Sequence, residues 1–180
     1  MYESPTLGVY KMAKVKEISK AKLFIGVLYS DENTLKNVTN DLIKQYGEIE
    51  KESESYEFSF TNYYENEMGK NLLKKFIVFK NLIDRNKIAD IKLETNEIED
   101  KYSKNNNRII NLDPGYLTKD NIILASVKES PYKVYIGKGI FGHLTLMYSN
   151  KKWNANERTF PDFKNEKVQE FFLEVRKCLA

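Results

Sequence analysis

The order of apolar patterns along the chain limits its fold more than any other feature of the sequence. Residues 22–29 form a compact apolar run typical of a strand. An amphipathic stripe that Ser30 or Asp31 can cap and Gly47 can end predicts a helix after it. Continued to residue 112, the patterns predict strand, helix, strand, strand, helix and strand, placed near residues 22–29, 31–47, 55–60, 71–80, 84–102 and 108–112.

That order is the split βαβ pattern of ferredoxin-like domains. We therefore predict an α+β fold, with a ferredoxin-like antiparallel sheet and helices on one face, extended by a C-terminal β-hairpin and helix. Gly137-Lys138-Gly139 lies between the hairpin strands 131–136 and 140–148, and residues 165–179 form the last helix. Residues 118–127 fit either a short capped helix or a strand. Residues 14–180 are expected to form a single α+β domain behind a flexible N-terminal extension, residues 1–13, with Met1 or Met12 as the native start.

Composition restricts the setting of the protein more than its chemistry. Cys178 is the single cysteine, which excludes an internal disulfide and favours a reducing, cytoplasmic location. The longest apolar runs are far shorter than the ~20 residues of a spanning helix, so we expect no membrane partner. A net charge of +3 is too small to argue for nucleic acid. The sequence is compatible with a homodimer.

The segment from Asn111 to Thr118 is the most distinctive polar stretch. Pro114 presets φ for a turn and Gly115 can supply a positive φ, so a type II turn would explain Asp113-Pro114-Gly115 without a ligand. The alternative interpretation is that this segment forms part of a binding site. A turn at a strand end would present Asn111, Asp113 and Tyr116 together, to bind a metal, a sugar or the edge of a base.

Three other motifs have a structural and a functional interpretation. Gly137-Lys138-Gly139 fits a hairpin turn better than a phosphate loop, which needs a longer glycine-rich turn opening a helix. His143, the only histidine, is expected to be a half-exposed strand residue, with acid–base work as the alternative. Glu65 and Glu67 could share acid and base roles or hold a divalent cation, or could be solvated.

Four segments, residues 60–69, 91–97, 111–117 and 135–140, resemble the signature segments of an uncharacterised prokaryotic family, domain of unknown function 4416. The resemblance spans about Lys14 to Val175, and Thr159-Phe160-Pro161-Asp162 is similar to a further segment of the family. It implies a small cytosolic protein without an established reaction. Some members carry a GTP-binding label, but this sequence lacks the motifs that would support it. The matches draw attention to Tyr64, Glu65, Glu67, Lys92, Asn96, Glu97, Asn111, Asp113, Tyr116, Lys138 and Asp162.

We predict a small-ligand protein, binding or hydrolytic, whose ligand contains a phosphate or a nucleotide. The candidates for catalysis, or for holding Mg²⁺ or Mn²⁺, are Glu65, Glu67 and Asp113. The candidates for ligand binding are Tyr64, Lys92, Asn96, Glu97, Asn111, Tyr116, Lys138 and Asp162. The alternative is a non-enzymatic protein-interaction or oligomerisation module. Convergence of the polar residues in one pocket would favour the first class, and a flat aromatic patch would favour the second.

Overall fold

A computed structural model describes residues 14–105 and 107–179 of the chain. The predicted extension at residues 1–13 lies outside the described residues. The helices are α1 (Glu32–Tyr46), α2 (Glu65–Met68), α3 (Ile88–Tyr102) and α4 (Glu166–Lys177), with short 3₁₀ helices η1 (Arg85–Lys87) and η2 (Pro161–Lys164). The strands are β1 (Ala21–Tyr29), β2 (Ile49–Glu52), β3 (Tyr56–Glu57), β4 (Leu73–Ile83), β5 (Ile110–Leu117), β6 (Asn121–Ser126), β7 (Lys133–Gly137), β8 (Ile140–Ser149) and β9 (Lys152–Ala155).

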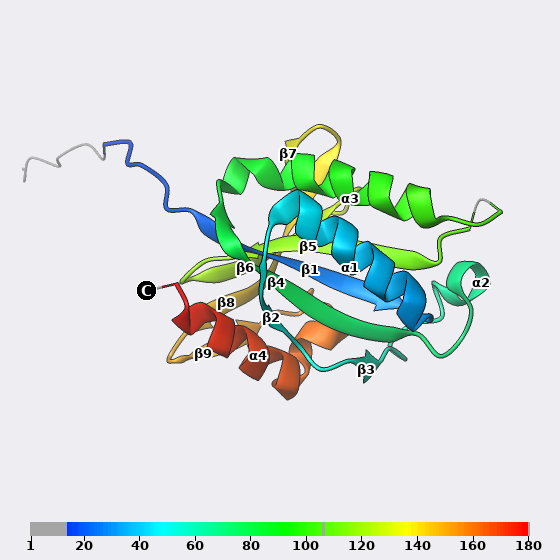
Figure 1. Cartoon of the computed structure of the whole chain (residues 1–180). Coiled ribbons are helices and arrows are strands. Elements are labelled where there is room, and N and C mark those ends of the chain that lie inside the picture. Colours follow the sequence, from blue (N-terminus) through cyan, green and yellow to red (C-terminus); the bar gives the residue numbers. More distant parts are fainter. Residues whose placement is uncertain (1–13, 106, 180) are drawn as a thin grey trace, which may run out of the picture.

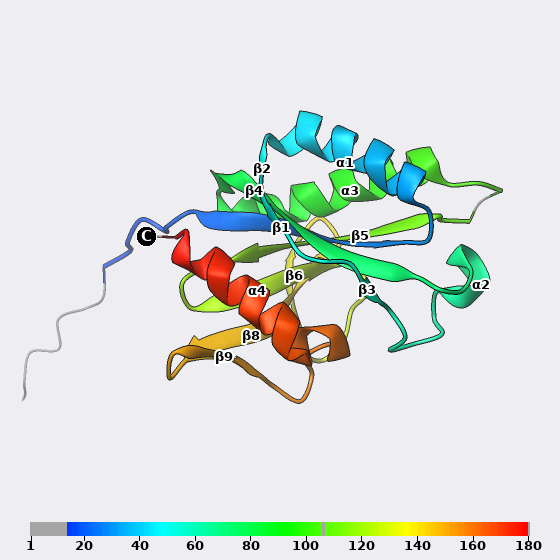
Figure 2. The same cartoon turned by 60° about the horizontal axis from the view of Figure 1, so that its bottom comes forward.

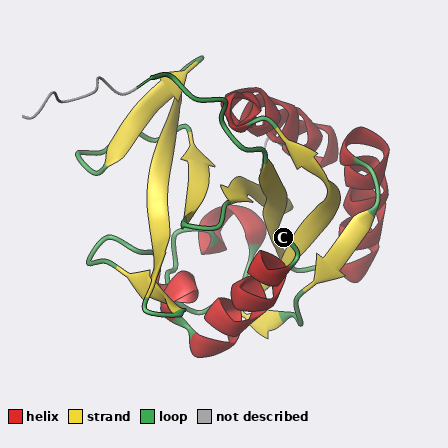
Figure 3. Cartoon of the chain, turned by 90° about the vertical axis from the view of Figure 1, so that its left-hand side faces the viewer, coloured by secondary structure: helices red, strands yellow, loops and turns green. Residues whose placement is uncertain are grey.

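The strands form one open antiparallel sheet in the order β2-β4-β1-β5-β6-β8-β7, with β3 added beside β4 and β9 beside β8. β1 pairs with β4 on one side and with β5 on the other. Figure 3 shows that the strands curve rather than lying flat. The predicted α+β class with a large antiparallel sheet is confirmed. No helix in the described residues is both long and apolar enough to cross a membrane.

Two apolar cores lie on opposite faces of the sheet. α1 and α3 lie side by side over one face, where Leu23, Ile25 and Val27 of β1 are buried (Figure 1). α4 covers the other face, where Phe24 of β1 and Phe76 and Val78 of β4 are buried (Figure 2). Since successive strand residues point to opposite faces, β1, which is buried along its whole length, belongs to both cores.

Several local predictions differ from the structure. The alternating pattern at residues 55–60 yields only the two-residue β3, and the edge strand β2 was not predicted. Residues 118–127, which fitted a helix or a strand, contain the strand β6. Cys178, expected on the apolar stripe of the last helix, follows α4 and is exposed.

The predicted turn at Asp113-Pro114-Gly115 is wrong, because these residues continue β5 without a break. Gly115 is needed for close packing, not for a positive φ. A Cβ atom there would lie 2.4 Å from the Cζ of Phe24 and 2.6 Å from the carbonyl oxygen of Ile123 in β6. Only glycine lets β1, β5 and β6 approach this closely.

The ladder between β5 and β6 ends at Pro114. The paired residues run from Leu117 with Ile122 to Gly115 with Leu124 and stop there. The Leu112 N–H points away from β1, to a side chain of α3, so by strand alternation the Pro114 nitrogen faces the same side. Proline has no N–H to give β6 at that point. β6 therefore leaves β5 beyond Leu124.

Candidate functional site

A cavity of about 480 Å³ opens where β5 and β6 separate. Its wall combines the strands β4 to β8 and the helix α3 with the connections before α2 and before α4. Its polar lining residues are Thr61, Tyr63, Tyr64, Lys74, Lys92, Asn96, Glu99, Arg108, Asn111, Asp113, Ser126, Lys128, Lys133, His143 and Asp162. Its apolar lining residues are Phe58, Phe60, Leu124, Ala125, Val127, Phe160, Pro161 and Phe163.

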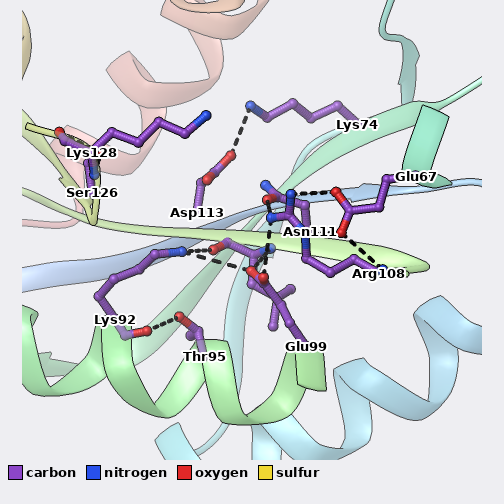
Figure 4. Close-up of polar contacts among 11 residues, drawn as sticks. Glu67, Lys74, Lys92, Thr95, Glu99, Arg108, Asn111, Asp113, Ser126 and Lys128 are labelled. Carbon is purple, nitrogen blue, oxygen red and sulfur yellow. Dashed lines mark hydrogen bonds and ion pairs between the residues drawn. The ribbon is translucent and has the colours of Figure 1, made fainter. Parts of the chain in front are cut away.

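A buried lysine between two aspartates forms one end of the wall. Lys74 of β4 places its Nζ 2.6 Å from Oδ2 of Asp162 and 3.7 Å from Oδ2 of Asp113 (Figure 4 shows the second pair). Burial lowers the pKa of Lys74, but the two carboxylates overcome this effect and hold its pKa above the usual value. Asp162 is almost fully buried, whereas the Asp113 side chain keeps 31% of its surface exposed. Asp113 therefore remains available to a ligand in the cavity.

Arg108, which precedes β5, forms a second charged part of the wall. Its guanidinium donates to both carboxylate oxygens of Glu67, at 2.8 and 2.7 Å, and to Oδ1 of Asn111 at 2.8 Å (Figure 4). The hydrogen bonds from Arg108 lower the pKa of Glu67. Such a two-point contact fixes the plane of the guanidinium. Both carboxylate oxygens of Glu67 are therefore occupied by Arg108.

Two side chains of α3 replace β6 as the partner of β5. Lys92 donates to the carbonyl oxygen of Leu112 at 2.7 Å, and Glu99 accepts from the Leu112 N–H at 2.6 Å (Figure 4). Lys92 Nζ and Glu99 Oε1 are 3.8 Å apart. Burial raises the pKa of Glu99. The pair satisfies backbone groups that the end of the ladder would leave exposed inside the cavity wall.

Lys128 and Lys133 differ from the other cations of the cavity, because neither has a carboxylate within ion-pair distance among the described residues. Lys133 donates to Oγ of Ser126 at 2.7 Å and to the Lys128 carbonyl at 2.9 Å. Burial, with a smaller effect of Lys128, lowers the pKa of Lys133. The Nζ atom of Lys128 lies 3.7 Å from the centre of the Tyr63 ring.

Two deeply buried atoms of the lining have no hydrogen-bond partner in the described part of the chain, Nδ2 of Asn111 and Nδ1 of His143. Both residues are only 4% exposed, so the prediction that His143 is half-exposed is wrong. Leaving a buried polar atom unpaired costs about 1–3 kcal/mol. These atoms are therefore the strongest indication that the cavity accommodates a polar ligand.

A family model for the domain of unknown function (DUF4416) matches residues 19–178. The chain belongs to this family. The resemblance that the sequence suggested is thereby confirmed. No curated protein and no solved structure matches the chain.

In this DUF4416 member, the cavity brings together about half of the predicted site residues, namely Tyr64, Lys92, Asn96, Asn111, Asp113 and Asp162. Glu67 reaches it only through Arg108. The others do not line it. Glu65 begins α2, Glu97 is exposed on α3, and Tyr116 packs against the core beneath α1 and α3. Lys138 lies on the β7–β8 turn and pairs with Asp90.

The candidate ligands for magnesium or manganese, Glu65, Glu67 and Asp113, do not form one cluster of metal ligands in the described residues. Asp113 faces Lys74 and Glu67 binds Arg108, so the two carboxylates are each opposed by a cation. Over residues 14–105 and 107–179, no three histidine, cysteine, aspartate or glutamate side chains gather in a way that could hold a metal ion.

Sequence reasoning missed four cations of the site, Lys74, Arg108, Lys128 and Lys133, and gave His143 a function only as the alternative interpretation. The sequence did contain a signal for one of these residues, Lys74. Lys74 stands two residues before Phe76 and four before Val78, so strand alternation places it on the same buried face. A lysine at such a position needs a buried carboxylate partner.

Proposed function

We propose that this protein binds a small organic anion in the cavity, with a phosphate group as its charged part. The charge balance supports this. Five cationic side chains line the cavity, Lys74, Lys92, Arg108, Lys128 and Lys133, against the carboxylates of Glu99, Asp113 and Asp162. Even with Glu67 added, one positive charge is in excess, and Lys128 and Lys133 are the cations without an ion pair in the described residues.

The aromatic lining favours an organic ligand over a bare ion. Phe58, Phe60, Tyr63, Tyr64 and Phe160 contribute ring surface around the polar wall. A mostly apolar cavity with a few placed polar groups is typical of small-molecule sites. A nucleotide, with a flat base and a phosphate, has the matching chemistry.

Thermal shift and calorimetry with inorganic phosphate, AMP, ADP and ATP test the proposal. We expect at least one of these to raise the melting temperature, because a ligand that binds only the folded state stabilises it. Lys133→Gln should weaken binding about tenfold or more, since a hydrogen bond to a charged group contributes roughly 1.5–3 kcal/mol. Lys36→Gln, an exposed position on α1, is the matched control. If the Lys133→Gln and Lys36→Gln variants bind the phosphate compound equally well, this cavity is ruled out as its binding site.

We propose further that β1 to β5 form a ferredoxin-like unit and that the protein is cytoplasmic. The strand order β2-β4-β1-β5, antiparallel throughout, with α1 and α3 on one face, supports the first proposal. The single cysteine supports the second.

The alternative function, an interaction or oligomerisation module, is favoured by one observation. β7 forms the end of the sheet, and its residues Val134, Tyr135 and Ile136 are exposed. Exposed apolar edge strands pair with other chains. Light scattering during size-exclusion chromatography tests this: a dimer that Val134→Lys converts to a monomer would support the module, and a monomer at all concentrations would exclude self-association.

A further inference from the structure

His143 has a defined tautomer in this structure. Its Nε2 lies 3.1 Å from the carbonyl oxygen of Arg158. A carbonyl oxygen only accepts, so Nε2 carries the proton and Nδ1 presents a bare lone pair. Burial lowers the pKa of His143, which keeps the ring neutral at pH 7. The cavity therefore contains a buried acceptor that needs a donor.

The position of His143 limits what the donor can be. His143 lies directly opposite Lys133 in the β7–β8 ladder and opposite Leu124 in the β6–β8 ladder. Directly opposite residues in an antiparallel pair have Cβ atoms about 4.5–5.5 Å apart on the same face. All three residues line the cavity. The charge of Lys133 also lowers the pKa of His143, so a ligand group bound by His143 would lie near an anion bound by Lys133.

The phosphate itself is a poor partner for Nδ1. A phosphate monoester has a second pKa of about 6, so above neutral pH it offers acceptors and no proton. A hydroxyl group beside the phosphate does offer one. Asn111 presents the complementary group, because its Oδ1 is occupied by Arg108 and its buried Nδ2 is a donor without a partner in the described residues.

We infer that the cavity is specific for a hydroxylated phosphate ester, in which Lys133 binds the phosphate and His143 Nδ1 accepts a hydrogen bond from a neighbouring ligand hydroxyl. Asn111 Nδ2 donates to a ligand oxygen. This inference rests on the proposed function. The shared chemistry is that of a sugar phosphate, which occurs free and as the ribose phosphate of a nucleotide.

Calorimetry at pH 7.5 with matched ligands tests the inference. Ribose 5-phosphate is compared with n-propyl phosphate, which has the ester but no free hydroxyl, and AMP with 2′,3′-dideoxy-AMP. We expect the hydroxylated member of a pair to bind about tenfold more tightly. Preference in the first pair indicates a free sugar phosphate, and preference in the second pair alone indicates a nucleotide.

Two substitutions isolate the acceptor. His143→Gln can keep the donor toward Arg158 and removes the acceptor at Nδ1, so it should reduce the tenfold preference to less than about threefold. His143→Asn can keep an acceptor near Nδ1 and should retain more of the preference. Lys133→Gln should weaken both members of each pair alike. Lys36→Gln should change nothing.

The single histidine also permits a test without a substitution. The ¹⁵N resonance of His143 Nδ1 should move on adding the hydroxylated ligand and stay in place with its hydroxyl-free partner. A preference retained in His143→Gln, or absent in the unsubstituted protein, overturns the inference while phosphate binding stands. Absence of binding by every phosphate compound overturns the proposed function and the inference with it.

Discussion

Lys74→Met tests whether the buried charge cluster holds the cavity wall together. The substitution keeps the length of the side chain but removes the ammonium 2.6 Å from Asp162 and 3.7 Å from Asp113. Both Lys74 and Asp162 are buried, so the carboxylate loses its partner without gaining water. Removing one member of a buried ion pair costs about 3–5 kcal/mol. For a chain of this size that corresponds to a fall in melting temperature of roughly 6–20 °C.

Lys75→Met is the matched control. Lys75 is the next residue of β4 and pairs with Glu52 near the surface, where an ion pair contributes about 0–1 kcal/mol. Urea unfolding at pH 7 measures both variants. Lys74→Met/Asp162→Asn should recover most of the loss, because it removes the unpaired charge and keeps an oxygen for the Phe163 N–H. If Lys74→Met costs no more than Lys75→Met, the cluster does not stabilise the fold.

Three further substitutions follow from the same structure. Gly115→Ala should destabilise the protein by about 1–3 kcal/mol in urea unfolding, because the added Cβ meets the β6 backbone, whereas at Gly142 it meets only side-chain methyl groups and the cost should be smaller. His143 has a folded-state pKa below its unfolded value, so its contribution to stability is complete above about pH 7 and is lost as the pH falls below ~6.5; His143→Gln should flatten the change between pH 7.5 and 5.5. Arg108→Lys keeps the charge but loses the two-point contact with Glu67, so a loss of about 1–2 kcal/mol is expected, and equal stability in urea would contradict the contact.

The sequence predicted the elements whose signals are local. Asp31 accepts from the Thr34 N–H at 2.7 Å and begins α1, and Gly47, with φ of 92°, ends it, both as expected. The same local rules failed at Asp113-Pro114-Gly115, where turn residues stand inside a strand. Proline is accepted there because its nitrogen faces the side without a ladder, and glycine because three strands meet. Both reasons concern neighbours far away in the chain, which turn propensities do not contain.

The candidate site, like the fold, could be predicted from the sequence only in part. Asn111 and Asp113 were singled out for their place in a polar segment, and both line the cavity. Their partners could not be derived in this way. Lys74 and Asp162 are 88 residues apart, and Arg108 and Glu67 are 41 apart, so only the folded sheet brings each pair together. Lys138, which also looked suitable for an anion, is on an exposed turn instead.

The cavity lies where the ladder between β5 and β6 stops, next to Pro114. If β6 continued beside β5, Ser126 would lie opposite Asp113 and the space between them would be filled by a ladder. Instead β6 stays paired with β8 through Ser126, while Leu112 is bonded by Lys92 and Glu99 of α3. The polar atoms of Asn111 and Asp113 then border a space and not a neighbouring strand. A residue at position 114 with an N–H would supply one more donor toward β6, but Leu112 would still be bonded by Lys92 and Glu99, so Pro114 and these two side chains of α3 together account for the opening between β5 and β6.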